Sequence, residues 1–139
     1  RLLLINTNRM QPPIAPVALD YLATTLRRAG HTVDLLDLCF APGPEEAIDR
    51  QLRLVEYEGI GLTFRNTEDC FYPGHSWYLP ELVASVGAIR ARSAAPIILG
   101  GAGFSVLPQA ILQATGVDFG VAGEGEFVLE EIGEHTSEL

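Results

Sequence analysis

Residues 97–126 read IILGGAGFSVLPQAILQATGVDFGVAGEGE, and this stretch decides the fold. It contains two similar units, each a short apolar run that ends in glycines. The apolar runs predict strands at residues 97–99 and 117–121, and residues 107–114 between them predict a short helix that Gly116 closes. Two parallel strands that each end in a glycine turn place backbone without side chains at one edge of a sheet. We therefore expect a ligand to lie against this edge.

The remainder of the chain continues the same alternation of strand and helix. Apolar runs predict three earlier strands, at residues 2–5, 31–38 and 59–64. Helical periodicity predicts four further helices, at residues 17–28, 45–55, 79–92 and 124–134. Regular alternation favours a Rossmann-like, doubly wound α/β fold with five parallel strands. We expect the flavodoxin-like strand order 2-1-3-4-5, which places the switch point between the first and third strands.

Composition limits the classes of partner. With 139 residues the chain is predicted to be one domain, residues 1–139, cut from a longer protein. No apolar run approaches the roughly 18 residues of a membrane span, and a net charge of −9 disfavours nucleic acid and anionic membranes. The two cysteines, Cys39 and Cys70, fit neither a disulfide framework nor a zinc site, so we expect no metal site and a cytoplasmic location.

The carboxyl ends of the predicted strands lead into four segments, at residues 6–13, 64–78, 100–105 and 122–126. Glycines spread over two neighbouring turns suit a broad, flat ligand better than a compact phosphate. Two alternatives stay open. Gly101 and Gly103 can begin an incomplete dinucleotide-binding motif, although it lacks a third glycine and follows the fourth strand. The glycines can also serve only tight turns.

The segment at residues 65–78 is unusually long for a loop in a compact domain, and its aromatic content argues against disorder. Its polar and aromatic side chains are candidates for contact with a ligand or with an adjoining domain: Asn66, Asp69, Tyr72, His75 and Trp77. Trp77 and Tyr78 can instead anchor the helix that follows. Cys70 can be a thiolate near the ligand or a small buried hydrophobic residue.

Three segments resemble the cobalamin (vitamin B12)-binding domain of radical S-adenosylmethionine enzymes. They are residues 12–23 with 29–33, residues 100–105 and residues 121–126, so the resemblance covers nearly the whole chain. It implies a corrinoid over the carboxyl edge of the sheet, with the nucleotide tail running down between strand ends. It also implies a downstream radical domain with a [4Fe-4S] cluster and S-adenosylmethionine, since the chain has no C-x-x-x-C-x-x-C run.

The resemblance further implies a methyltransferase acting on a small molecule or peptide, and residues 65–69 are similar to members that methylate an indole carbon. The fragment alone would not be catalytic. The residues implied to hold the cofactor are Asn6, Pro12, Pro13, Arg65, Asn66, Gly100, Gly101, Gly103, Phe104, Ser105, Gly123, Glu124, Gly125 and Glu126. Ser105 can hydrogen-bond the nucleotide tail or cap the helix that follows.

The family's usual cobalt-binding motif, D-x-H-x-x-G, is missing, and His31, His75 and His135 do not replace it. We therefore expect cobalamin without a histidine lower ligand. Arg65 is predicted to lie beneath the cobalt, where a guanidinium that stays protonated fills space but cannot coordinate the metal. Alternatively, Arg65 pairs with a nearby surface carboxylate, Glu68 or Asp69.

Three rival classes remain. The first is a flavodoxin-like binding or interaction module without a corrinoid, although residues 6–13 are too proline-rich for a flavodoxin phosphate loop. The second is a receiver domain, which needs a phospho-accepting aspartate after the third strand, where residues 64–66 read Phe-Arg-Asn. The third is a radical enzyme domain that keeps the fold and has lost the cofactor.

Overall fold

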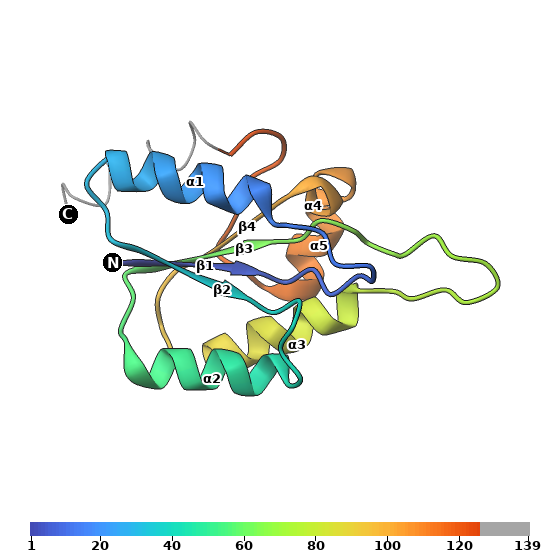
Figure 1. Cartoon of the computed structure of the whole chain (residues 1–139), viewed down its shortest axis with the longest axis horizontal. Helices are drawn as coiled ribbons and strands as arrows, with labels where there is room; N and C mark the ends of the chain where they lie inside the picture. Colours follow the sequence, from blue (N-terminus) through green and yellow to red (C-terminus); the bar gives the residue numbers. More distant parts are fainter. Residues whose placement is uncertain (126–139) are drawn as a thin grey trace.

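The computed structural model describes residues 1–125 and forms one parallel sheet flanked by helices (Figure 1). The strands are β1 (Leu2–Asn6), β2 (Val33–Asp37), β3 (Gly59–Thr63), β4 (Ile97–Gly100) and β5 (Phe119–Gly120). The helices are α1 (Val17–Arg28), α2 (Pro44–Leu54), α3 (Leu79–Arg90), α4 (Ala102–Val106) and α5 (Pro108–Thr115). The strand order β2-β1-β3-β4-β5 confirms the predicted fold class and the switch point between β1 and β3.

The predicted elements agree with the observed ones to within a few residues, with one addition. The glycine turn after β4 winds at once into the short helix α4, which the sequence pattern did not predict. Gly101 has a φ of 106° and reverses the chain direction, and the Phe64 carbonyl then accepts bonds from the N–H groups of Gly103 and Phe104 at 2.9 and 3.2 Å. The helix predicted at residues 124–134 lies outside the described residues except for residues 124 and 125, which are not helical.

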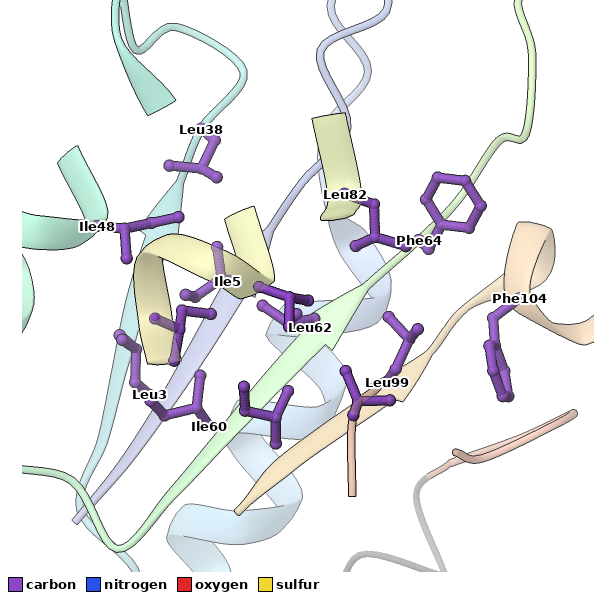
Figure 2. Close-up of a cluster of buried hydrophobic side chains, with 14 of the residues drawn as sticks. Leu3, Ile5, Leu38, Ile48, Ile60, Leu62, Phe64, Leu82, Leu99 and Phe104 are labelled. Carbon is purple, nitrogen blue, oxygen red and sulfur yellow. The ribbon is translucent and has the colours of Figure 1, made fainter. Parts of the chain in front are cut away.

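One face of the sheet carries the main hydrophobic core. Because side chains alternate along a strand, Leu3 and Ile5 of β1 lie on the same face as Ile60, Leu62 and Leu99 (Figure 2). Helices α2, α3 and α5 cover this face, and α3 packs against both α2 and α5. The core continues to the carboxyl edge with Phe64 and Phe104.

The opposite face is covered only in part by the described helices. Helix α1 packs over β1 and β2 through Leu19, Ala23 and Leu26. The same face continues onto β3 and β4, where Gly61 pairs in register with Leu4 on one side and Ile98 on the other. Gly61 and Ile98 are only half-buried, so an open strip of sheet lies beside α1.

Asp118 ties the short edge strand β5 to the rest of the sheet. Its Oδ2 accepts a hydrogen bond from the Ile97 N–H at 2.7 Å and pairs with Arg90, whose guanidinium also donates to the Ala95 carbonyl. The Ile97 N–H, followed by Arg90, holds the pKa of Asp118 below its usual range.

We expect Asp118→Ala to lower the free energy of unfolding by about 1 kcal/mol at pH 7. The substitution removes a half-exposed carboxylate, so the Ile97 N–H and Arg90 lose their partner. A carboxylate with a lowered folded-state pKa stabilises the protein above its unfolded pKa, about 3.9, and the effect is lost as the pH falls through the folded value. The difference between wild type and variant should therefore shrink at pH 3. Urea titration followed by circular dichroism checks this, with the exposed Glu56→Ala as control. A difference that stays the same at both pH values would contradict the prediction.

Candidate functional site

Two adjoining pockets open at the carboxyl edge of the sheet, on the side of α1. The larger has a volume of about 410 Å³ and the smaller about 330 Å³. Both are lined by Ala18, Leu19, Thr63, Gly101 and Ala102. We therefore describe them as one hollow with two parts, a groove that runs down the sheet and a cup at the edge.

The groove exists because β3 carries a glycine at its centre. Leu4, Gly61 and Ile98 form its floor in one register row across three strands. A methyl group added at Gly61 would lie 2.7 Å from the Leu4 Cδ2 and would stand in the groove. Glycine weakens a strand interior, and one at such a place often marks close approach of a ligand. Leu19 and Leu22 of α1 make one wall, so the groove suits an apolar group.

The two glycine turns form the other wall, and Ser105 joins them. Its hydroxyl donates to the Gly101 carbonyl and accepts from the Gly123 N–H, both at 3.0 Å. Gly101 and Gly123 have φ values of 106° and 91°, which side chains rarely tolerate. A Cβ at Gly101 would also lie 2.6 Å from the Phe64 carbonyl oxygen. The turns are thus held together in a shape that requires glycine.

The cup lies at the switch point between β1 and β3. Its wall includes Asn6, Asn8 and Arg65. Asn6 is buried and donates to Asp37 Oδ1 at 2.8 Å, while its own Oδ1 accepts from the Asn8 N–H at 3.1 Å. The Thr7 hydroxyl donates to the Thr63 carbonyl at 2.6 Å. These bonds hold the first loop against the strand ends.

Eight of the residues implied by the resemblance line the groove or the cup. They are Asn6, Arg65, Gly100, Gly101, Ser105, Gly123 and Gly125, with Glu124 as the eighth. Gly103 and Phe104 are buried, Gly103 against the Arg65 backbone and Phe104 in the core. Pro12 and Pro13 are exposed, and neither lines either pocket. Glu126 lies outside the described residues.

Two further residues have unsatisfied polar groups near the edge. The buried Oδ1 of Asn66 and the Nε of Arg9 have no hydrogen-bond partner among residues 1–125.

Arg65 is exposed at the cup, and within residues 1–125 no carboxylate forms an ion pair with it. Glu68 instead contacts His75, and Asp69 Oδ1 accepts from the N–H groups of Phe71 and Ser76 at 3.2 and 3.1 Å. The structure thus does not show the alternative Arg65 ion pair.

The other side chains of residues 69–77 lie away from both pockets: Asp69, Cys70, Tyr72, His75 and Trp77. In the described part of the chain, no group of three or more His, Cys, Asp or Glu side chains is arranged to hold a metal ion. None of the helices described there is long and apolar enough to cross a membrane.

Sequence reasoning missed several residues of the hollow. The groove wall residues Ala18 and Leu22 and the floor residues Gly61 and Ile98 were not predicted, whereas the cup residue Asn8 lies in the predicted segment at residues 6–13. Gly61 carried a usable signal, because a glycine between Ile60 and Leu62 interrupts an otherwise apolar central strand. Ala18 and Ile98 carried none, because an alanine on a helix and an isoleucine in a strand are ordinary core residues.

An open parallel sheet with a hollow beyond its switch point defines a doubly wound ligand-binding domain. An apolar groove beside two glycine turns suits a large ligand. The family model of the B12 binding domain matches residues 4–133, so the chain belongs to the B12-binding domain family. This confirms the predicted family and its cofactor, cobalamin.

Known relatives support the assignment. The chain is 33% identical over 136 residues to a tryptophan 2-C-methyltransferase from Streptomyces laurentii, covering 97% of this chain and 23% of that protein. Two solved structures of the radical S-adenosylmethionine methyltransferase TsrM from Kitasatospora setae match with a TM-score of 0.92 and 35% identity over 99% of this chain. One contains cobalamin and a [4Fe-4S] cluster, and the other tryptophan substrate and the analogue aza-SAM. The chain spans about a quarter of these relatives, 24% and 26% of the two structures.

The residues of the hollow fit a corrinoid. The glycine turns offer a surface without side chains to a flat ring, and the Gly61 floor leaves room for an aromatic base between Leu22 and Ile98. The Ser105 hydroxyl lies at the groove wall, between the two glycine turns. No histidine lines either pocket.

Proposed function

We propose that this B12-binding domain is the corrinoid domain of a cobalamin-dependent radical S-adenosylmethionine methyltransferase. The remainder of the polypeptide would hold the [4Fe-4S] cluster, S-adenosylmethionine and the substrate. The observation that carries the proposal is the open groove over Gly61, which continues into the cup at the switch point. The radical methyltransferases among the relatives, 33–35% identical, support the reaction class.

We assign the two parts of the hollow to two parts of cobalamin. The groove would take the nucleotide tail, because its floor and one wall are the apolar residues Leu4, Leu22 and Ile98. The cup and the glycine turns would support the lower face and edge of the corrin, with Asn6 as a polar contact. Asn66 lines neither pocket, and its buried Oδ1 has no hydrogen-bond partner among residues 1–125, so its contact with the corrin edge stays a prediction.

Arg65 would lie beneath the cobalt without coordinating it. Bound cobalamin supplies a carrier for the methyl group. Arg65 is exposed at the cup wall, with no carboxylate of the described residues paired to it, so its guanidinium is available to fill that space. Because the guanidinium stays protonated, it has no lone pair to donate, and its bulk keeps water from the same position.

For the substrate we propose an indole, with tryptophan as the first compound to test. The support is the 33% identity to an enzyme whose name specifies methylation of tryptophan at carbon 2. Incubation of the full-length protein with methyl-labelled S-adenosylmethionine and tryptophan is expected to give labelled methyltryptophan. Labelled product from other aromatic compounds but none from tryptophan would contradict this substrate and leave the cofactor assignment intact.

Cobalamin binding is tested directly by mixing the purified protein with hydroxocobalamin and separating the two by gel filtration. We expect the red colour to elute with the protein in about equal molar amount, because the groove and the cup together form one site for the cofactor. The elution profile is read at a visible wavelength of the corrin and at the protein band. Colour that elutes only with the small molecules would favour the alternative, a flavodoxin-like module without a corrinoid.

A further inference from the structure

Residues 67–78 form an antiparallel hairpin, which we call the aromatic hairpin. The Tyr78 N–H donates to the Thr67 carbonyl at 2.9 Å, and the Asp69 N–H donates to the Ser76 carbonyl at 3.2 Å. Glu68 and Trp77 pair across the two arms. In Figure 1 the segment between β3 and α3 extends farther from the sheet than any other described loop, beyond the carboxyl edge.

The hairpin is braced by its own side chains. Asp69 Oδ1 accepts hydrogen bonds from the backbone N–H groups of Phe71 and Ser76, at 3.2 and 3.1 Å, and so closes the tip. The His75 Nε2 contacts Glu68 Oε2 across the arms. A segment that serves only as a connection does not need such bracing, because a flexible loop closes the same gap.

Three large aromatic side chains of the hairpin are exposed. The exposed fractions are 55% for Phe71, 98% for Tyr72 and 46% for Trp77. Tryptophan and tyrosine that are held in place and exposed together are typical of the centre of a protein–protein interface, where they contribute most of the binding energy. The described residues leave Tyr72 almost fully exposed and cover only about half of Phe71 and Trp77.

We propose that the aromatic hairpin docks onto the catalytic part of the same polypeptide, the part that would hold the cluster and the substrate. This inference rests on the proposed function. The hairpin begins two residues after Arg65, at the edge of the cup, so a partner that closes over the bound corrin must also pass the hairpin. The chain spans only 23–26% of its relatives, so such a partner exists within proteins of this kind.

A second copy of this domain is a weaker candidate for the partner. The domain has a net charge of −9, so two copies repel one another. The hairpin itself presents Glu68 and Asp69 beside its aromatic residues, with His75 as the only basic side chain among residues 67–78. Self-association through this tip would bring like charges together.

Photo-cross-linking of the full-length protein tests the proposal. Tyr72 is replaced by p-benzoylphenylalanine, a change that its exposure allows without disturbing the core. After irradiation, we expect most cross-linked product to remain one polypeptide, with position 72 joined to a peptide beyond residue 139. Leu54→p-benzoylphenylalanine is the matched control, since Leu54 is 75% exposed at the end of α2, on the opposite edge of the sheet.

Several results would overturn the proposal. They are a cross-linked dimer, an adduct of cobalamin, links confined to residues 1–139, the absence of any link, or an equal yield to the same peptide from position 54. The corrin absorbance of the same samples is recorded before irradiation. Loss of cobalamin with the expected link would contradict the cofactor assignment alone, and retained cobalamin with another link would contradict the docking alone.

Discussion

Replacement of Gly61 by valine is expected to abolish retention of cobalamin while the domain stays folded. Gly61 is the floor of the groove, and a Cβ there would meet only the flexible end of Leu4, which can move. Valine also suits a central strand better than glycine, so stability should be unchanged or higher. The side chain would fill the space that we assign to the nucleotide tail.

We expect affinity for hydroxocobalamin to fall at least about 100-fold, which corresponds to about 2.7 kcal/mol. Absorbance titration measures the affinity, and urea denaturation of the same preparation measures the stability. Wild-type affinity in a folded Gly61→Val protein would show that the tail does not lie in the groove.

A second position reaches the same space from the other side. Ala18→Phe places a bulky side chain at an exposed position of α1, where both pockets meet, and should also block binding. Ala84→Phe on the exposed side of α3 is the matched control, because Ala84 lines neither pocket. Equal loss of binding in both variants would indicate a general effect of the phenylalanine.

The order of the sheet and the position of the site edge could be predicted because each depends on a local pattern. The central strands β1, β3 and β4 are mostly apolar runs, and the turns that border the groove contain glycines with positive φ, Gly101 and Gly123. A parallel sheet then places the ends of all strands at one edge, whatever the details of packing. For this reason the sequence could place Gly100, Gly101, Gly123 and Gly125 at this edge, together with Arg65 at the end of β3.

The shape of the hollow could not be predicted, because it depends on which strand positions lie in register and on how far α1 extends over the sheet. Gly61 forms the floor only because it pairs with Leu4 and Ile98. Asp37 likewise accepts the hydrogen bond from Asn6 only because the two residues pair in register across β1 and β2. Such contacts join residues far apart in the chain, and a single sequence contains no periodic signal for them.

Phe104 shows the opposite limit. Its position inside a glycine turn suggested contact with the cofactor, but the turn continues as α4 and directs the ring into the core. A methyl group added at Gly120 would lie 2.3 Å from the Phe104 ring, so that glycine makes room for the aromatic side chain. One of the glycines in the stretch that decides the fold therefore serves packing, and only the local geometry separates it from those that line the groove.

Replacement of Arg65 by histidine is expected to change the visible spectrum of bound cobalamin and to slow methyl transfer. Arg65 lines the cup, and none of the described carboxylates pairs with its guanidinium. A neutral imidazole has a lone pair that a guanidinium lacks, so histidine at this position can coordinate a metal. We expect retention of cobalamin to persist, because the groove over Gly61 is unaltered.

An added lower ligand would hold the cobalt more firmly to its carried group, so turnover should fall at least about tenfold, or about 1.4 kcal/mol in the barrier. Arg65→Lys separates charge from ligation, because an ammonium group stays protonated and should leave the spectrum close to that of the wild type. Arg28→His, on the exposed last turn of α1, controls for a histidine elsewhere on the surface. If Arg65→His leaves both the spectrum and the turnover unchanged, Arg65 does not lie beneath the cobalt, and the cup must hold another part of the cofactor.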